Sequence, residues 1–253
     1  MNHWQQQKQQ QNAKFAGGTR AHVTTSNIIT RYIVDWRLSE AFHRLSKAAE
    51  GSISSESKIL FMCAGEGMEG SILCDMGFKC VTISDISDVA VAEAMRRDKR
   101  LKGIVLNAER SDQPDASFDV VVVQDGLHHL QNPVLGFTEM LRIARLGVLF
   151  LEPHDSFIGK VLGTEWEKNG EATNYVFRWN KKLVQDVASS YLPRNSFQNL
   201  SFSFWHHNIV FDKIGRALGG GRIGLFTIQF LKMALDSMLG KMGNQFCGAV
   251  LKR

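Results

Sequence analysis

Apolar residues along the chain form short runs of strand length that alternate with stretches of helical spacing. Between Lys58 and Pro153 the strand-like runs cover 59–62, 80–83, 104–106, 118–123 and 146–151. In the segments between them, apolar residues recur every three or four positions, as they do on one face of a helix. This alternation predicts an α/β fold: a mostly parallel sheet with helices on both faces and ligand sites at the carboxyl ends of the strands.

The chain before the first strand has two parts. Residues 1–18 are rich in glutamine and lack the apolar spacing of a buried element, which predicts a disordered tail. Residues 19–57 carry helical spacing and predict an N-terminal helical cover, in which Ser39 is placed to begin a second helix. Trp36 in this cover is expected either in the core or facing a ligand.

After the fifth strand, the pattern predicts two more strands, near 197–205 and 247–251, and two insertions on the substrate side. The first insertion, 154–197, contains an aromatic and arginine cluster at 170–179. The second, 209–244, contains a flexible GGGR break followed by a largely apolar helix, and its charged residues are mostly basic. An apolar, basic insertion of this kind predicts peripheral membrane contact, a homodimer interface or a cap over the active site.

Composition narrows the class of protein. The chain has 253 residues, 44% of them hydrophobic, with a formal net charge of +5. This size fits one α/β domain with additions, and no nucleic-acid motif is present, so no nucleic-acid partner is expected. The four cysteines form no C-x-x-C pair, which predicts a reducing, cytoplasmic setting and no metal site. No leader or uninterrupted apolar run of ~18–20 residues is seen, so peripheral membrane contact is the expected alternative to a purely cytoplasmic protein.

The stretch Lys58–Ser87 carries the strongest chemical signal. It combines a strand, the glycine-rich turn GEGMEG at 65–70, a helix and a second strand that ends at Asp85. Glycines allow a tight turn and the close approach of a ligand, and a carboxylate at the second strand's end can accept hydrogen bonds from both ribose hydroxyls. The pattern fits both the dinucleotide fingerprint and the looser glycine loop of S-adenosylmethionine (SAM) enzymes, and by itself does not separate them.

Downstream segments carry a family resemblance. SFDVVVVQDGLHHLQNP at 117–133 resembles the fourth-strand region of class I SAM-dependent methyltransferases of the small-molecule type. VTISDIS at 81–87, NAE at 107–109 and ARLGVLFLEP at 144–153 resemble, in the same order, the family's ribose acid, adenine loop and fifth strand. The resemblance implies a seven-stranded, mostly parallel Rossmann-like sheet closed by an antiparallel strand, a SAM-binding domain over 58–253, and SAM as the cofactor.

The resemblance also implies which residues bind the cofactor: the glycine loop, the ribose acid and its neighbour, the adenine loop and the tip of the fourth strand. In this chain they are Cys63, Ala64, Gly65, Gly67, Asp85, Ile86, Asn107, Ala108 and Gln124. The chain departs from the family where Cys63 replaces an acid that helps hold the amino group of SAM. Glu69 stands where a third glycine is common, and Asn107 replaces the adenine-loop acid.

Candidate catalytic bases lie where strands end. They are Asp125, His128, His129 and His154. Histidine titrates near pH ~6.5 and can accept a proton at neutral pH. Because consecutive residues on a helix point about 100° apart, only one of His128 and His129 is expected to face the substrate. For each histidine a purely structural role is the alternative.

Together these features predict a SAM-dependent methyltransferase that acts on an oxygen or nitrogen of a small molecule, with sugars, aromatic compounds and lipid-linked compounds as candidate acceptors. Two alternatives remain from the sequence. One is an NAD(P)-dependent oxidoreductase, because the glycine turn also fits the dinucleotide fingerprint. The other is a non-catalytic partner subunit that keeps the methyltransferase fold, because Cys63 and Glu69 depart from the family pattern.

Overall fold

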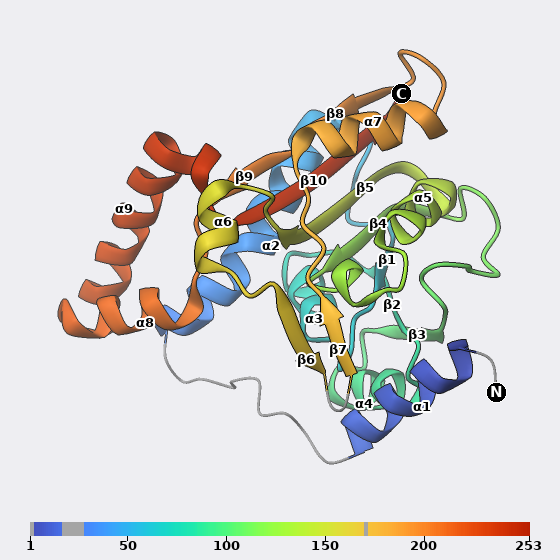
Figure 1. Ribbon diagram of the computed structural model, residues 1–253, viewed down its shortest axis with the longest axis horizontal. Coiled ribbons are helices and arrows are strands. Elements are labelled where there is room, and N and C mark those ends of the chain that lie inside the picture. The colour runs from blue at the N-terminus through green and yellow to red at the C-terminus, as the bar shows by residue number, and fades with distance from the viewer. Residues whose placement is uncertain (1–2, 17–27, 170–171) are drawn as a thin grey trace.

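A central sheet organises the protein, seen in a computed structural model that describes residues 3–16, 28–169 and 172–253. Its strands run in the spatial order β3-β2-β1-β4-β5-β10-β8, with β9 also paired to β10 (Figure 1). Their bounds are β1 (Lys58–Met62), β2 (Cys80–Asp85), β3 (Lys102–Val105), β4 (Phe118–Gln124), β5 (Ala144–Pro153), β8 (Phe197–Asn199), β9 (Phe202–Phe204) and β10 (Gln245–Lys252).

The strand directions confirm the predicted fold class. β1 to β5 are parallel to one another, and β10 pairs antiparallel with β5. The predicted strand at 197–205 is split into β8 and β9, which both pair with β10. Between them the Leu200 amide donates to the Ala249 carbonyl, and the Ser201 hydroxyl accepts from the Ala249 amide. The two short strands therefore occupy one position, and the sheet keeps seven positions.

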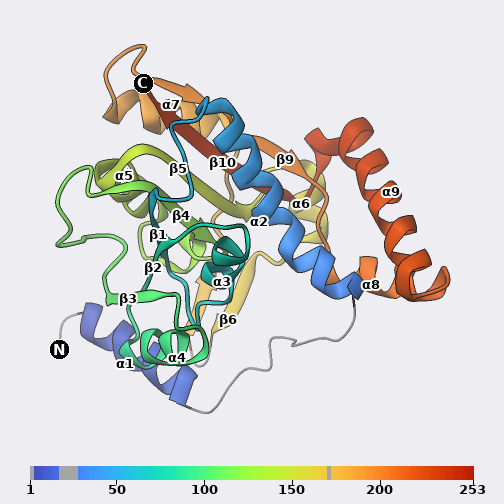
Figure 2. The same ribbon diagram turned by 180° about the vertical axis from the view of Figure 1, so that it is seen from behind.

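Helices cover both faces of the sheet. α2 (Ile28–Ala48), α3 (Met68–Asp75) and α4 (Asp88–Arg97) lie on one face (Figure 2), and α5 (Pro133–Ile143) and α7 (Lys181–Tyr191) lie on the other. Alternate residues of a strand point to opposite faces of a sheet. In β4, Val120 and Val122 accordingly pack against the helices α2 to α4. Val121 and Val123 pack against α5 and α7 on the other face. Both cores are apolar, which explains the unbroken apolar run of this strand.

The predicted disordered tail is wrong over residues 3–16, which form the helix α1 (His3–Ala16). Glutamine, alanine and lysine are good helix formers, so the low apolar content does not prevent a helix here. Contacts at the start of α4 hold α1 in place: Lys8 forms an ion pair with Asp88 at 3.2 Å, and the Ser87 hydroxyl donates to Asn12 Oδ1 at 2.6 Å. Residues 17–27 of the predicted cover lie outside the described residues.

The cover is a single long helix, α2, and Ser39 does not begin a second one. Leu38, Phe42 and Leu45 are fully buried and place α2 on the sheet. Trp36 packs edge-on against Phe204, in agreement with the core alternative, and Arg31 is exposed beside Asp35. The helix thus covers the sheet with one face and leaves its charged face in solvent.

The first insertion begins with the short helix α6 (Phe157–Leu162) and a hairpin made of β6 (Trp166–Asn169) and β7 (Ala172–Tyr175). The hairpin contacts the 3-10 helix η1 (Leu127–His129), which follows β4. A segment distant in sequence is thereby brought to the carboxyl ends of the central strands (Figure 1).

The second insertion forms α8 (Asn208–Ala217), α9 (Gly221–Leu239) and the 3-10 helix η2 (Gly240–Met242), and stands at one edge of the molecule (Figures 1 and 2). The predicted break is real: Gly219, Gly220 and Gly221 all have positive φ. Lys232 anchors α9, because its buried ammonium lies 3.5 Å from the centre of the Trp36 ring and 3.1 Å from the Asp236 carboxylate. Burial lowers the pKa of Lys232 to about 8, although Asp236 opposes the shift.

Candidate active site

The glycine loop after β1 forms the floor of the predicted cofactor crevice. Gly65 and Gly67 both have positive φ. A side chain at Gly67 would come within 2.6 Å of the Ala94 methyl group, so this glycine is required by packing against α4. A side chain at Gly65 would meet only the Phe15 ring of α1, at 3.4 Å. The missing side chain at Gly65 leaves space beside the backbone, and the Phe15 ring of α1 borders this space.

Asp85, the predicted ribose acid, lies at the end of β2 beside this loop. One carboxylate oxygen accepts the Gly65 amide at 2.9 Å, and the other accepts the Ser87 amide at 3.0 Å. Burial raises the pKa of the Asp85 carboxyl, although these amide hydrogen bonds oppose the shift. Each oxygen keeps a second lone pair, so the fixed carboxylate can still accept two ligand hydroxyls.

The predicted adenine loop lies next along the same edge. The Asn107 side-chain oxygen accepts the Glu109 amide at 2.9 Å, which fixes the turn, and Ala108 is buried. Ile86 directly follows Asp85 at the end of β2. The structure therefore brings these three predicted residues to the carboxyl edge of the sheet, on the side of Asp85.

Sequence reasoning missed the part played by Glu69. This residue is in the first turn of α3, and Gln124 at the end of β4 donates its side-chain amide to the Glu69 carboxylate at 3.2 Å. Burial raises the pKa of Glu69, and the nearby Arg37 opposes the shift. Gln124 Oε1 is buried and has no hydrogen-bond partner among the described residues. A carboxylate and an unpaired carbonyl oxygen thus lie together beside the glycine loop, a pair suited to binding an ammonium group.

Asp125, a predicted catalytic base, follows Gln124 and has a positive φ of 50°. Positive φ is uncommon for residues other than glycine and turns the chain sharply at the strand end. The Asp125 carboxylate pairs with the buried Arg37 guanidinium of α2. This ion pair ties the end of β4 to α2. The only sequence signal for Arg37 was its place beside Trp36 in the predicted cover.

His128 lies in η1 and is held by a carboxylate that the sequence prediction did not use. Its Nδ1 is hydrogen-bonded to Glu152, which is fully buried at the end of β5 and also accepts the amides of Gly126 and Leu127. Burial alone would lower the pKa of His128, but Glu152 and Glu167 outweigh it and raise the pKa to about 10. A pKa of about 10 favours an imidazolium ion at neutral pH, and so favours the structural alternative for His128 over its predicted role as a proton acceptor.

His129 has the opposite character. Burial and the positive charge of His128 lower its pKa to about 4, so the ring is neutral at pH 7. Its Nδ1 is buried and has no hydrogen-bond partner in the described part of the chain. The two histidine rings are 4.1 Å apart and line the same cavity. The expectation that only one of them faces the site is not met, because both rings line this cavity although the residues are consecutive on η1.

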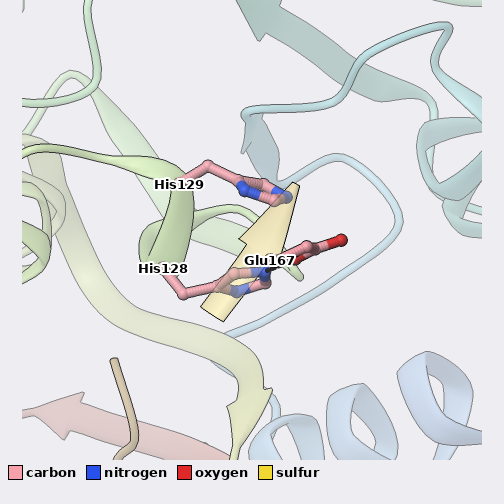
Figure 3. A group of neighbouring side chains, drawn as sticks. All are labelled: His128, His129 and Glu167. Atoms are coloured by element: carbon pink, nitrogen blue, oxygen red, sulfur yellow. Dashed lines mark ion pairs between the residues drawn. The ribbon is translucent and has the colours of Figure 1, made fainter. Parts of the chain in front are cut away.

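Glu167 on β6 completes the cluster (Figure 3). Its carboxylate lies 3.5 Å from His128 Nε2, and potential ligand atoms of His128, His129 and Glu167 all lie within 4.8 Å of one another. Such a spacing can hold a metal ion. The His128 imidazolium also lies between the carboxylates of Glu152 and Glu167, so the group has its own ion pairs and keeps one net negative charge. The cluster can therefore act as a site that binds or releases a proton.

His154, the fourth predicted catalytic residue, does not line the cavity. Its Nδ1 is 2.7 Å from the Gly243 carbonyl oxygen, and its ring stacks on Phe246. Burial lowers the pKa of His154. The residue fastens the end of the second insertion to β5, so its predicted role as a base or substrate ligand is not supported, and the structural alternative describes it.

A cavity of about 630 Å³ extends from this cluster toward the two insertions. Asp125, His128, His129 and Glu167 line its inner end. Its outer walls are mainly apolar and come from the second insertion and the segment before it: Trp205, Val210, Phe211, Ile214, Leu231 and Leu235. Arg178 also lines it. A cavity of this size accommodates a ligand of several rings or a ring with part of a chain.

The part of the chain that carries this site is similar to known methyltransferases. A family model described as a methyltransferase domain matches residues 61–151, which run from the end of β1 through the glycine loop into β5. A demethylmenaquinone methyltransferase of Beutenbergia cavernae is 32% identical over 119 residues, which are 47% of this chain. That match spans about half, 49%, of the relative's own length.

Solved structures agree with the whole fold. A magnesium protoporphyrin IX methyltransferase from Synechocystis PCC 6803 with bound SAM has a TM-score of 0.58 at 10% identity, with 100% of this chain and 98% of that chain covered. The [4+2]-cyclase SpnF also has a TM-score of 0.58, at 14% identity, with coverages of 96% and 91%. The predicted resemblance to class I SAM-dependent methyltransferases is confirmed, and the matches support SAM as the cofactor.

Proposed function

We propose that this chain of the class I SAM-dependent methyltransferase superfamily transfers a methyl group to a hydroxyl oxygen of an apolar, ring-bearing small molecule. The observation that carries the proposal is the position of two consecutive residues. The side chain of Gln124 donates a hydrogen bond to Glu69 beside the glycine loop, and the next residue, Asp125, lines the large cavity. A methyl donor in the crevice and an acceptor in the cavity would therefore meet at the end of β4.

The crevice has donors and acceptors that fit SAM. Asp85 would take the ribose hydroxyls, and the open space at Gly65 would admit the methionine part. Glu69 and the unpaired Gln124 oxygen would hold the ammonium group, which replaces the role of the family's acid at Cys63. When bound, SAM supplies a methyl group activated by a positively charged sulfur. The protein's contribution is alignment, which can be worth ~7–11 kcal/mol in such reactions.

The cavity favours an apolar acceptor. Most of its exposed lining is aromatic and aliphatic, so it offers more surface to apolar rings and chains than to the many hydroxyls of a sugar. We therefore favour the aromatic and lipid-linked acceptors over the sugars among the candidates. Two relatives are named for demethylmenaquinone and magnesium protoporphyrin IX, both ring compounds, which agrees with this choice.

His128 and His129 would have different roles at the acceptor hydroxyl. The His128 imidazolium, held between Glu152 and Glu167, would fix the position of the neighbouring His129 ring. Neutral His129 would accept the hydroxyl proton as the oxygen gains the methyl group. A pKa of about 4 makes His129 a weak base, but an oxygen that is being methylated becomes strongly acidic, so a weak base suffices. General bases of this kind contribute roughly 10²–10⁴ in rate.

The proposal is tested by incubating the purified protein with SAM that carries an isotope-labelled methyl group. The acceptors are a naphthoquinol with an isoprenoid chain, a simple phenol and a hexose, and products are measured by mass spectrometry. We expect label on the ring hydroxyl of the apolar acceptors and none on the hexose. His129→Ala is expected to reduce kcat by about 10²-fold or more, and His43→Ala, which changes an exposed histidine on α2, serves as the control.

Asp85→Ala tests the cofactor half separately. We expect calorimetry to show loss of SAM binding, because the amides of Gly65 and Ser87 lose their common acceptor and the ribose loses its partner. Asp186→Ala on the exposed face of α7 is the matched control. Unchanged SAM affinity in Asp85→Ala would remove this residue from the cofactor site. NAD(P)H found bound in native mass spectra, with no methyl transfer, would favour the oxidoreductase alternative.

A further inference from the structure

The second insertion exposes an apolar face that neither the crevice nor the cavity uses. Along α9, large apolar side chains at helical spacing are 61–71% exposed: Ile223, Phe226, Phe230 and Met233. Met238, at the end of the helix, is 81% exposed. Isolated exposed apolar residues are ordinary, but a continuous row on one helix indicates a surface that contacts something else.

The first insertion carries two more exposed apolar residues. α6 contacts η2, and Phe157 and Val161 of α6 are 81% and 66% exposed. These two residues are four positions apart and therefore lie on the same side of their helix. We call the exposed apolar residues of α6 and α9 the apolar face. Figures 1 and 2 show α9 standing away from the sheet at one edge of the molecule, so this face is accessible to a large partner.

The charge around the apolar face is positive. In 208–244 the exposed charged residues are all basic: Lys213, Arg216, Arg222 and Lys241. The two acidic residues of the segment are less exposed and pair with cations of their own helices, Asp212 with Arg216 and Asp236 with Lys232. An apolar helix face flanked by exposed arginine and lysine is the arrangement by which helices bind the surface of an anionic bilayer.

We propose that the apolar face docks the protein on an anionic lipid bilayer, with α9 lying in the interface. A second copy of the chain fits less well, because a symmetric contact would place the basic residues of one insertion against those of the other. Among the described residues, Gly221–Met242 is the one segment long and apolar enough to span a membrane. Lying flat agrees better with its contacts, since buried Lys232 ties the helix to Trp36 and to the carboxylate of Asp236.

The apolar face and the cavity wall lie on the same helix, which connects docking on a bilayer with the acceptor site. Leu231 and Leu235 of the same helix line the cavity, so one side of α9 faces the acceptor site while another faces outward. A lipid-soluble acceptor could pass from the bilayer to the cavity along this helix without crossing water. Docking itself does not depend on the proposed reaction, and it can be measured without cofactor or acceptor.

The test is co-sedimentation of the full chain with vesicles of phosphatidylcholine alone or mixed with phosphatidylglycerol. We expect binding to the mixed vesicles that weakens with added salt, and at least about ten-fold weaker binding by Phe226→Ser/Phe230→Ser, because two exposed aromatic rings lose their lipid contact. Arg222→Glu/Lys241→Glu should also weaken binding to the mixed vesicles. Leu135→Ser, which changes an exposed leucine on α5, is the matched control and should bind as the wild type does.

Three outcomes would overturn the proposal. The first is no binding of the wild type to anionic vesicles. The second is unchanged binding of Phe226→Ser/Phe230→Ser, with its fold verified by circular dichroism. The third is a dimer in light scattering that the same two substitutions convert to a monomer without effect on vesicle binding, which would assign the face to a second copy. None of these results bears on methyl transfer, so failure of docking is distinguishable from failure of the proposed function.

Discussion

At the scale of single residues, the predicted cofactor crevice has its carboxylate at a different position from the one that is usual in the family. Cys63 stands where the family has an acid, and burial together with nearby carboxylates raises the pKa of its thiol, so it carries no charge at neutral pH. Glu69 brings a carboxylate to Gln124 from the first turn of α3. The negative charge is thus supplied from the helix that follows the glycine loop and not from the end of β1. In the proposed function, this carboxylate takes over the binding of the SAM ammonium group from the acid that Cys63 replaces.

Glu69→Gln is expected to weaken SAM binding by about 10- to 100-fold, because a hydrogen bond to a charged group contributes ~1.5–3 kcal/mol. Calorimetry with SAM measures the change. Glu93→Gln, which alters an exposed glutamate paired with Arg96 and Arg97 on α4, is the control and should keep the wild-type affinity. Equal affinities of Glu69→Gln and the wild type would show that Glu69 does not contact the ammonium group.

His128 makes the stability of the protein depend on pH in a defined direction. Its folded-state pKa of about 10 is above the ordinary histidine value of 6.5, so the folded protein binds this proton more tightly than the unfolded chain. The resulting stabilisation is fully present below pH 6.5 and is lost as pH rises toward 10. Between pH 7 and 9 we expect His128 to lower the free energy of unfolding by up to about 1.4 kcal/mol per pH unit.

Urea unfolding of the wild type and His128→Gln at pH 7, 8 and 9 checks this slope. The difference in unfolding free energy between the two proteins should shrink as pH rises, and comparison with the wild type removes the effect of Lys232, which has the opposite sign. If His128→Gln does not fold, Glu167→Gln removes one of the two flanking carboxylates and should reduce the slope. A difference that stays constant from pH 7 to 9 would mean that His128 is not protonated in the folded state.

At the scale of elements, the spacing of apolar residues predicted the strands and helices that depend on nearby residues in the chain. The strands and the helices between them followed from runs such as Phe118–Val123, because burial on both faces leaves a direct apolar signature. α1 escaped prediction because its polar residues are held by two contacts to α4 and by no apolar stripe. Arg37, Glu152 and Glu167 are far apart in the chain, and only the packing of α2, β5 and the hairpin brings them to the site. No spacing rule links them.

α1 lies over the predicted cofactor crevice, beside Ser87 and Gly65. Asn12 bonds the Ser87 hydroxyl next to the ribose acid, and the Phe15 ring is the side chain nearest to the open space at Gly65. We expect Phe15→Ala to raise the dissociation rate of S-adenosylhomocysteine about ten-fold, a change of ~1.4 kcal/mol. Stopped-flow displacement measures the rate, and Gln10→Ala on the exposed side of α1 is the control. Slower dissociation from Phe15→Ala would instead mean that the ring competes with the ligand.

At the scale of the whole molecule, the two halves of the site come from different parts of the chain. The sheet and its loops form the crevice, as the sequence resemblance predicted for residues 58–153. The insertions form most of the cavity, where sequence gave only apolar and aromatic composition. A shared fold therefore constrains the methyl donor more strongly than the acceptor. The [4+2]-cyclase SpnF, which shares the fold, shows that the fold alone does not settle the reaction.

The choice of cofactor can be tested on the intact molecule through its thermal stability. A ligand that binds only the folded state, at 100 times its dissociation constant, adds about 2.7 kcal/mol to the unfolding free energy. For a protein of this size that corresponds to a rise in Tm of roughly 5–10 °C. We expect S-adenosylhomocysteine to produce this rise, NADH to produce none, and Asp85→Ala to abolish the effect. A rise with NADH alone would point to the oxidoreductase alternative, and no rise with either ligand would favour a non-catalytic partner subunit.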